Sequence, residues 1–368
     1  MKRRHLLTTA LLLPQSQIFA ADTSETRHAW RMPDEAEPHL RTWMAFGANR
    51  AIWGAKLLPE VRRNLALIAN TIAKYEPVSM LVNSRDMALA QSLVGNNVSL
   101  HVCPLDDLWM RDTGPVFVTK PGKTTGQTSN KKAGIQFNFN GWGQKQAFKQ
   151  DAQLASFIAK QAKVELLHTP LVLEGGCIEV DGHGTTIMTE SCILNDNRNP
   201  GVGKAAVEAE LKRLLGLQKI IWLSGIKGND ITDGHTDFYA RFASPGVVIA
   251  GFDPDPASYD HAVTAKHLEL LTTATDAQGR KLDVITLEGP SRVRKSFENK
   301  EFAAGYIGFY VCNGAVIAQE FGDAKADAAA KARLQRAFPG RVIEQLNVDG
   351  IAAGGGSIHC TTQQEISV

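Results

Sequence analysis

The chemically most suggestive stretch of the chain is a glycine run that ends on a cysteine close to the carboxyl terminus. Residues 354–360 read Gly-Gly-Gly-Ser-Ile-His-Cys. Glycine permits positive φ and close approach of the backbone to a ligand, so Gly355 and Gly356 are candidate substrate-binding residues. A thiolate is a strong nucleophile, and Cys360 is therefore a candidate for covalent catalysis. The alternative is a packing role, because free cysteine is among the most buried residue types.

Three further polar segments carry carboxylates and a histidine where predicted strands end. They are residues 109–115 with Asp112, residues 174–176 with Glu174, and residues 233–237 with His235 and Asp237. In an extended backbone His235 and Asp237 would face the same side, because side chains alternate along a strand. Each segment taken alone is also compatible with an ordinary solvated or Asp-capped turn.

One thiol, one imidazole and three carboxylates together favour chemistry on a cation. Carboxylates beside a thiol raise its pKa, which is unfavourable for an ordinary acyl-transfer protease. They suit a guanidinium substrate, whose planar N–H donors two carboxylates can bind bidentately. The positive charge of that substrate would favour the thiolate, and His235 is available as a base. The residue set therefore predicts nucleophilic attack on a guanidino carbon.

The composition and the order of predicted elements indicate one α/β domain. The 368 residues are 43% hydrophobic and 21% charged, and the formal net charge of +2 gives no reason to expect a nucleic-acid partner. Predicted strands alternate with helices in about five strand–turn–helix–strand modules. We assign residues 21–38 to a linker, residues 39–368 to a single domain and the polar residues 121–132 to an exposed loop.

Residues 1–20 have the features of an export signal in the usual order. Basic residues at positions 2–4 precede an apolar run from Leu6 to Leu13, and small or aliphatic residues stand at 18–20. The run is far shorter than the ~20 residues of a membrane span, and we expect no span elsewhere. We therefore expect an exported, periplasmic protein, and the arginine pair also admits a twin-arginine route. A cytoplasmic protein with a frayed amino terminus is the alternative.

The cysteine count bears on the redox state of the protein. There are five cysteines, an odd number, so at least one thiol stays unpaired within a single chain. No Cys-x-x-Cys occurs, so neither a zinc ribbon nor a thioredoxin-type dithiol is supported. Whether any of Cys103, Cys177, Cys192 and Cys312 pair stays open at this point.

Taken together, the motifs resemble the agmatine deiminase family, within the wider guanidino-modifying group that includes a bacterial peptidylarginine deiminase. The resemblance spans roughly residues 28–365 and rests on the four segments above and on residues 138–143, 194–200 and 359–364. It implies a five-bladed α/β propeller of the pentein type with pseudo-fivefold symmetry. It also implies conversion of agmatine to N-carbamoylputrescine and ammonia, a step of putrescine biosynthesis, without a metal or an organic cofactor.

The resemblance also implies a role for each candidate residue. Cys360 would attack the guanidinium carbon to form an S-alkylthiouronium intermediate, and His235 would be the general acid and base. Asp112 and Asp237 would grip the guanidinium nitrogens, and Glu174 would contact the histidine or the substrate. Two aromatic residues, Trp109 and Trp43, are candidates to line the aliphatic stem of the substrate, with core or rim packing as the alternative.

Two departures from the family pattern leave alternatives open. The chain carries an apparent export signal, and Gly308 stands where family members commonly carry asparagine. An exported deiminase of peptidyl arginine or of free arginine is therefore one alternative. A metallohydrolase using His235, Asp237, Glu174 and His359 and a non-catalytic periplasmic guanidino-binding protein are two others. A homodimer is compatible with the sequence, which does not itself set the oligomeric state.

Overall fold

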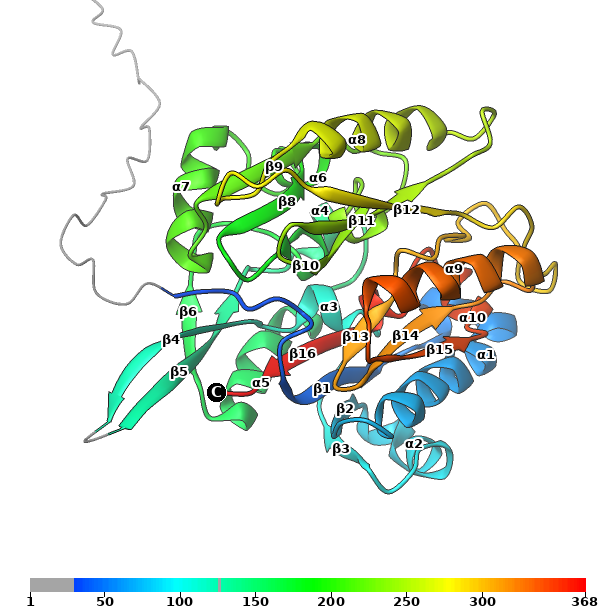
Figure 1. The fold of residues 1–368 in the computed structure, drawn as a ribbon. Helices are drawn as coiled ribbons and strands as arrows, with labels where there is room; N and C mark the ends of the chain where they lie inside the picture. Colours follow the sequence, from blue (N-terminus) through cyan, green and yellow to red (C-terminus); the bar gives the residue numbers. More distant parts are fainter. Residues whose placement is uncertain (1–29, 125–126) are drawn as a thin grey trace, which may run out of the picture.

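Five small β-sheets make up the described part of the chain, and four of them repeat one strand order (Figure 1). In each of the four, the first two strands pair antiparallel and the third pairs parallel to the second. The four sheets comprise β4 (Val116–Thr124), β5 (Gln127–Gln136) and β6 (Glu165–His168); β7 (Glu179–Val180), β8 (Thr185–Thr189) and β9 (Lys219–Leu223); β10 (Ala240–Ser244), β11 (Val247–Phe252) and β12 (Asp283–Glu288); and β13 (Tyr310–Cys312), β14 (Ala315–Gln319) and β15 (Val342–Leu346). The repeat confirms the prediction of a five-bladed α/β propeller.

The remaining sheet joins the two ends of the chain. It has the order β16-β1-β2-β3, built from β1 (His39–Phe46), β2 (Val78–Val82), β3 (Val98–Val102) and β16 (Thr362–Ile366). Strand β16 lies antiparallel beside β1, and Figure 1 shows the red strand against the blue one. This pairing places the glycine–cysteine segment just before β16 inside the first blade.

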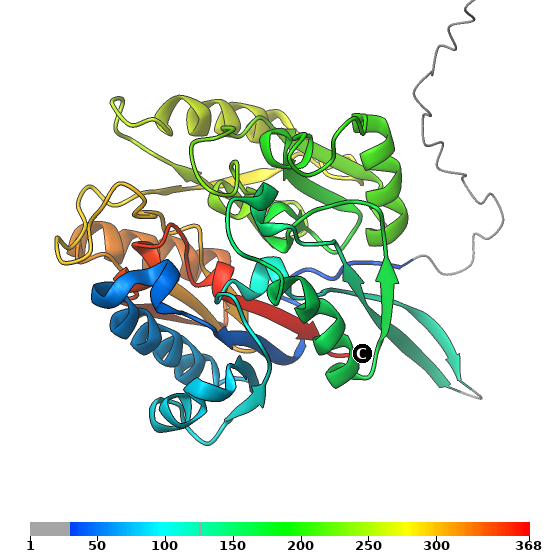
Figure 2. The same ribbon diagram turned by 180° about the vertical axis from the view of Figure 1, so that it is seen from behind.

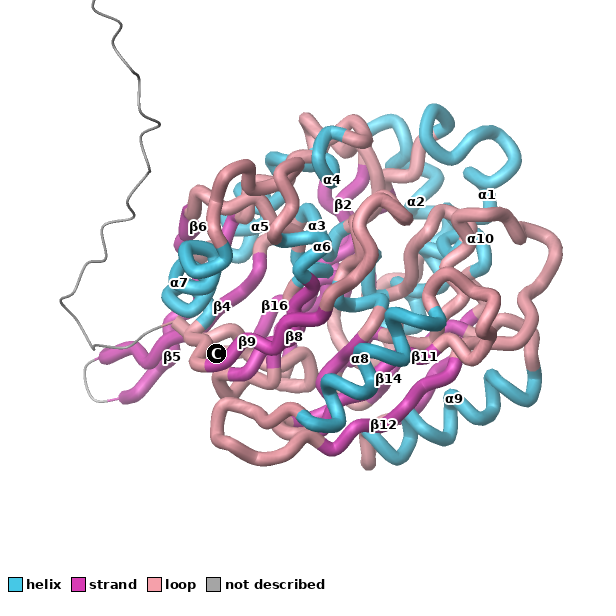
Figure 3. The backbone as a smooth tube through the Cα atoms, turned by 90° about the horizontal axis from the view of Figure 1, so that it is seen from above, coloured by secondary structure: helices cyan, strands magenta, loops and turns pink. Residues whose placement is uncertain are grey.

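The parallel strand pairs need long crossover connections, and helices supply them. The crossover helices are α1 (Arg50–Ile72), α5 (Leu154–Ala162), α7 (Lys204–Leu215), α8 (His261–Thr273) and α9 (Ala324–Ala337). Figures 1 and 3 show α1, α7 and α8 toward the outside of the molecule. Within α1, Val61, Leu65 and Ile68 recur at helical spacing and pack with Met80 of β2. None of the described helices is long and apolar enough to cross a bilayer.

Short helices and helical turns lie in the connections within and between the blades and carry most of the polar motifs. They are α2 (Met87–Leu93), α3 (Met110–Thr113), α4 (Gly141–Gln144), α6 (Glu190–Ile193) and α10 (Asp349–Ala352), with 3₁₀ turns η1 (Ser84–Asp86), η2 (Asp151–Gln153), η3 (Gly175–Cys177), η4 (Thr236–Phe238) and η5 (His359–Thr361). Asp112 lies in α3, Asp237 in η4 and Cys360 in η5. These turns hold the candidate residues at fixed positions between blades.

The computed structural model describes residues 30–124 and 127–368. The predicted export signal and residues 21–29 of the predicted linker lie outside the described residues. Residues 30–38 do not form the linker that we predicted, because Met32, Asp34 and Glu35 are buried in the domain. Their burial depends on partners from distant blades, which the local polar composition does not reveal.

The exposed loop predicted at residues 121–132 is also wrong. Most of this segment belongs to β4 and β5, which pair antiparallel from Val116↔Ile135 out to Thr124↔Gln127. Figures 1 and 2 show this hairpin extending away from the body of the molecule. Backbone hydrogen bonds between β4 and β5 form this ribbon. Its sequence lacks the apolar alternation on which strand prediction relies, which is why we predicted a loop.

The carboxylate of Glu35 joins segments from several blades near the centre of the propeller. Its Oε1 accepts hydrogen bonds from Arg241 Nη2 at 2.7 Å and from Val311 N at 2.9 Å. Its Oε2 accepts from Arg111 Nη2 at 2.8 Å and lies 2.9 Å from His359 Nε2. Burial alone would raise the pKa of Glu35, but Arg241, His359 and Arg111 hold it well below its ordinary value. Glu35 is therefore a charged structural hub.

Replacement of Glu35 by alanine should unfold the protein easily, because it leaves the buried guanidinium groups of Arg111 and Arg241 without this partner. We expect a loss of about 3–5 kcal/mol in the free energy of unfolding, measured by urea denaturation. Since the folded-state pKa of Glu35 is depressed, its contribution is present above about pH 5 and is lost as the pH falls through and below the ordinary carboxyl pKa of about 4.3.

The matched control is Glu37→Ala. Glu37 pairs with Arg31, and both side chains are partly exposed, so its loss should cost at most about 1 kcal/mol. Equal destabilisation by the two substitutions would contradict the assignment of Glu35 as the hub.

Candidate active site

A cavity of about 810 Å³ contains the candidate nucleophile and its neighbours. Cys360, His235 and Asp112 line it, and so do the predicted substrate-binding residues Gly355 and Gly356. Asp237 approaches the same place, with its Oδ2 3.8 Å from Cys360 Sγ. The four residues come from η5, the loop before η4, α3 and η4, so the assembly of the blades brings them together.

Asp112 and Asp237 both lie near Nδ1 of the His235 imidazole. Nδ1 of His235 lies 3.7 Å from Asp112 Oδ1 and 4.0 Å from Asp237 Oδ1. Asp112 accepts hydrogen bonds from Gly176 N at 3.1 Å and from Trp142 Nε1 at 3.0 Å. Among the described residues, the buried Asp237 Oδ1 has no hydrogen-bond partner. An unpaired carboxylate oxygen at this depth is a natural acceptor for a cationic N–H donor.

Glu174 holds the other side of the imidazole. Its Oε2 lies 3.3 Å from His235 Nε2, and its Oε1 accepts from Arg198 Nε at 3.0 Å. Burial opposes the charge, but the donors on His235 and Arg198 lower the pKa of Glu174 to about 2. Glu174 therefore contacts the histidine, one of its two predicted positions, and Arg198 is a partner that we did not identify from the sequence.

The electrostatic balance at His235 favours the protonated imidazole. Burial by itself would lower the pKa of His235, but Asp112, the sulfur of Cys192 and the hydrogen bond to Glu174 outweigh it and hold that pKa well above the ordinary value. Burial, together with the charges of Asp237 and Glu174, raises the pKa of Asp112 to about 6. His235 can accordingly act as an acid at neutral pH and be restored after giving up its proton.

His359 connects the site to the hub. Its Nδ1 lies 2.7 Å from Asp237 Oδ2 and its Nε2 lies 2.9 Å from Glu35 Oε2. Burial opposes ionisation of Asp237, but the bond to His359 lowers its pKa. Both ring nitrogens are therefore occupied, and the metal set that we considered for a metallohydrolase, in which His359 joined His235, is not supported. His359 instead fixes the orientation of Asp237.

Cys360 is surrounded by groups that disfavour its thiolate, with one exception. Burial, followed by the charges of Asp237 and Asp112, raises the pKa of Cys360 far above its ordinary value. Ser357 Oγ lies 3.3 Å from Cys360 Sγ and acts in the opposite direction. A guanidinium bound by the two carboxylates would also oppose their effect on the thiol.

Ser357 has room only because residue 308 is glycine. A Cβ atom at Gly308 would lie 2.2 Å from both Cβ and Oγ of Ser357. The backbone oxygen of Gly308 also accepts a hydrogen bond from His359 N at 3.0 Å. Glycine at position 308 thus makes room for the Ser357 hydroxyl beside the candidate nucleophile. Ser357 is a residue that our sequence reasoning missed.

Three tryptophans, Trp53, Trp109 and Trp142, line the cavity, and Trp43 of the predicted pair is not among them. Trp109 and Trp53 both line it, with ring centroids 5.8 Å apart. A Cβ at Gly356 would lie 2.2 Å from the ring of Trp109, which explains the need for glycine there. The prediction for Trp43 is wrong: it is 1% exposed, donates from Nε1 to Glu365 at 2.8 Å and packs in a separate core cluster. Alternation along β1 decides its direction.

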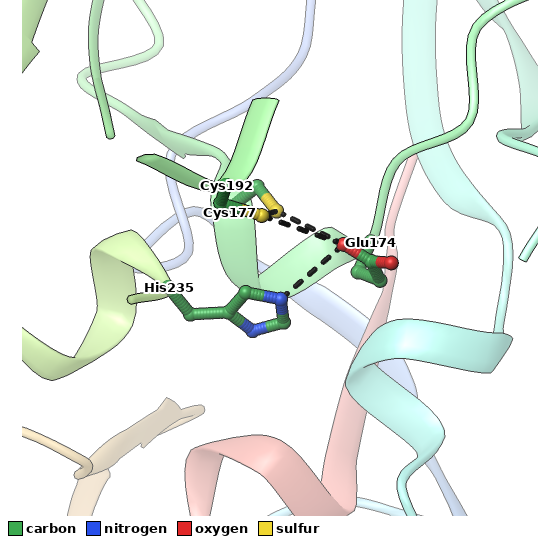
Figure 4. Close-up of side chains that lie close together, drawn as sticks. All are labelled: Glu174, Cys177, Cys192 and His235. Carbon is green, nitrogen blue, oxygen red and sulfur yellow. Dashed lines mark hydrogen bonds and ion pairs between the residues drawn. The ribbon is translucent and has the colours of Figure 1, made fainter. Parts of the chain in front are cut away.

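A different group of side chains has the composition of a metal site. Glu174, Cys177, Cys192 and His235 place one sulfur, nitrogen or oxygen atom each within 4.8 Å of one another (Figure 4). Sulfur and imidazole donors suit Zn²⁺ or a related thiophilic cation. Of this group only His235 lines the cavity, so Glu174 and the two cysteines lie behind its imidazole.

Comparison with known proteins identifies the family to which the chain belongs. The sequence profile of the family described as Porphyromonas-type peptidyl-arginine deiminase matches residues 31–365. The chain belongs to this family. Agmatine deiminase of Medicago truncatula is 32% identical over 373 residues, covering 94% of this chain and 99% of that protein. A Streptomyces coelicolor protein provisionally named an agmatine deiminase is 40% identical over 343 residues, covering 91% of this chain and 98% of its own.

The solved structures agree with the family membership. Agmatine deiminase of Enterococcus faecalis superimposes with a TM-score of 0.84 at 30% identity, covering 92% of this chain and 96% of that chain. The similarity therefore extends over most of the chain.

Replacement of Ser357 by alanine should raise the pKa of Cys360, because it removes the hydroxyl that lies 3.3 Å from the sulfur. We expect the pH profile of iodoacetamide alkylation at Cys360, and the rise of kcat/KM with pH, to shift upward by about 0.5–1 pH unit. The control is Thr361→Val, which removes a hydroxyl bonded to Ile358 O rather than to the sulfur. Coincident profiles for Ser357→Ala and the unmodified protein would show that the hydroxyl does not affect the thiol.

Proposed function

We propose that this protein is a guanidine hydrolase that converts agmatine to N-carbamoylputrescine and ammonia through a covalent intermediate on Cys360. The observation that carries the proposal is the pair of carboxylates, Asp112 and Asp237, that lie near Nδ1 of His235 and beside a thiol. One oxygen of that pair, Asp237 Oδ1, is buried without a partner among the described residues. The similar proteins of Medicago truncatula and Enterococcus faecalis are named agmatine deiminases, which supports the same chemistry here.

In the first half of the reaction, Asp112 and Asp237 bind the guanidinium N–H groups, and its charge favours the Cys360 thiolate. The sulfur attacks the guanidinium carbon and a C–S bond forms. His235, held protonated by Asp112 and Glu174, donates its proton to one terminal nitrogen. The C–N bond to that nitrogen breaks and ammonia leaves, so that an S-alkylthiouronium remains on Cys360.

In the second half, the now neutral His235 takes a proton from a water molecule that attacks the thiouronium carbon. The C–S bond then breaks, the thiolate of Cys360 is restored, and the new hydroxyl on the carbon loses its proton to become the ureido oxygen. Glu174 stabilises the imidazolium that forms at each return of the proton, through the contact of 3.3 Å to Nε2. The cycle consumes one water and releases one ammonia and one proton, which together make ammonium, so no redox partner is needed.

The charge of the cavity favours agmatine over free arginine. Asp230, Asp253 and Asp260 all line it, and their mutual repulsion contributes to a pKa of about 6 for Asp260, after the larger effect of burial. Asp260 Oδ1 is itself a buried acceptor without a partner in the described part of the chain. Such a group attracts the distal ammonium of agmatine and repels the α-carboxylate of arginine. The arginine and peptidyl-arginine deiminases remain the competing outcomes.

The reaction is tested by ammonia release from agmatine, free arginine and an arginine-containing peptide. We expect agmatine to be the preferred substrate and Cys360→Ala to lower kcat by on the order of 10⁴-fold or more, because the covalent route is lost. Cys103→Ser, a substitution in a separate core cluster, should leave kcat of the folded protein within about twofold. Preferred turnover of arginine or peptide would overturn the substrate assignment, and full activity of Cys360→Ala would overturn the mechanism.

Export and assembly stay predictions. The basic residues 2–4 followed by the apolar run to Leu13 support an export signal at residues 1–20 and a periplasmic location. Cell fractionation with amino-terminal sequencing checks this, since export predicts a periplasmic chain that begins near residue 21. A full-length cytoplasmic chain would contradict it. The predicted homodimer is checked by measuring the mass of the protein in solution.

A further inference from the structure

Two thiols outside the proposed reaction lie against each other behind the catalytic imidazole. The sulfur atoms of Cys177 and Cys192 are 2.8 Å apart, and both residues have no exposed surface. Figure 4 shows both side chains directed toward Glu174, the carboxylate that also contacts His235. Each sulfur lies near Glu174 Oε2, at 3.3 Å from Cys177 and 3.6 Å from Cys192.

Backbone contacts hold the two cysteines in this relation. Cys177 ends the turn η3, and its carbonyl oxygen accepts a hydrogen bond from Thr236 Oγ1 at 2.7 Å. Cys192 lies in α6, and the preceding residue Ser191 donates its N–H to Ser224 O at 3.1 Å. The folded chain thus holds both thiols at one place, which raises their effective concentration toward each other.

The geometry favours a covalent pair over a shared metal ion. Two thiolates on one tetrahedral Zn²⁺ stand roughly 3.7 Å apart, given Zn–S bonds of about 2.3 Å, whereas these sulfurs are 2.8 Å apart. Glu174, which would be a third ligand, is already paired through Oε1 with the fully buried guanidinium of Arg198. That positive charge opposes a second cation at the same carboxylate.

We propose that Cys177 and Cys192 form an intrachain disulfide, made by exchange with a dissolved disulfide such as oxidised glutathione. The thiolate of one cysteine attacks the external disulfide and releases one external thiolate. The second cysteine then attacks the mixed disulfide, releases the other external thiolate and closes the Cys177–Cys192 bond. Two protein thiols are oxidised and one external disulfide is reduced to two thiols, because the two released external thiolates take up the two protons that the protein thiols lose.

The electrostatics of the pair support this exchange. Although burial opposes ionisation, the thiol of Cys177 and the nearby His235 lower the pKa of Cys192. Cys192 therefore supplies the attacking thiolate more readily than Cys177, whose pKa burial and the neighbouring sulfur raise.

The bond would connect the turn after Glu174 with α6 and close a short loop of the third blade. Closure of a loop of this size limits the unfolded chain and stabilises the folded one. The other three cysteines, including the proposed nucleophile, would remain thiols. The bond therefore strengthens the support behind Glu174 and His235 without consuming Cys360.

The test is to unfold the full chain in urea and to refold it in glutathione buffers from reducing to oxidising. The folded fraction is trapped in acid, denatured, alkylated and mapped by mass spectrometry. We expect more than ~90% of it to carry the Cys177–Cys192 bond at equal concentrations of reduced and oxidised glutathione, and three of the five cysteines to be alkylated. Reduction of the bond should lower the midpoint of thermal unfolding by several degrees, on the order of the drop expected for other short-loop disulfides.

The controls separate this pair from other thiols. Cys177→Ser should leave every remaining cysteine alkylated, whereas Cys103→Ser should leave the disulfide intact. Native protein of the Cys360→Ala variant, oxidised with dilute hydrogen peroxide, gives the same mapping without any refolding step. There one cysteine becomes a sulfenic acid with loss of water, and the second displaces a further water to form the bond.

Three results would overturn the proposal. They are full alkylation of Cys177 and Cys192 in both the refolded and the peroxide-treated protein, a disulfide that uses another cysteine, and stoichiometric zinc that leaves when these thiols are oxidised. Since none of these readouts requires turnover, they do not depend on the substrate assignment.

Discussion

The structure depends on how one buried negative charge is neutralised at the centre of the propeller. Glu35 accepts hydrogen bonds from Arg111, Arg241 and a backbone N–H of β13, and it lies beside His359. An ion without such partners would be very costly to bury. Because the partners belong to different blades, the charge is satisfied only when the blades are correctly assembled. The segment before β1 is thereby part of the domain.

The same network reaches the active site through a single histidine. His359 contacts Glu35 with one ring nitrogen and Asp237 with the other. The carboxylate that should grip the substrate is therefore oriented from behind by the structural hub. One of its oxygens is committed to His359, while the other is buried and unpaired among the described residues. The division leaves one acceptor free for a cation and keeps its direction fixed.

Negatively charged groups surround the thiol in the active site, which makes the site selective for a cationic ligand. Burial and the carboxylates Asp237 and Asp112 disfavour the thiolate of Cys360. A neutral or anionic ligand would leave that effect in place, whereas a guanidinium opposes it at the atoms where reaction occurs. Ser357 provides a further neutral donor to the sulfur, and the glycine at position 308 makes the space for it. Substrate binding and nucleophile activation are consequently one electrostatic event in the proposed mechanism.

The sequence by itself determined the family, the five-module α/β architecture and the principal residues of the site, because residue chemistry and motif spacing carry that information. Cys360, His235, Asp112 and Asp237 do meet at one cavity, and Glu174 contacts the histidine. Strands that lack an apolar pattern were harder to predict from the sequence. The final strand β16 was missed because its buried residues are polar and are satisfied by distant partners, as Gln364 is by Arg111.

Only the tertiary structure decided which side chains support that set. In the folded protein Trp43 points into a separate core cluster, and Trp53 lies beside Trp109. Glu35 is buried, and Cys177 lies against Cys192. The direction of a side chain depends on strand register and on the packing of elements far apart in the chain. Those long-range contacts exist only once the five blades have closed around the buried charges, so local residue patterns do not contain them.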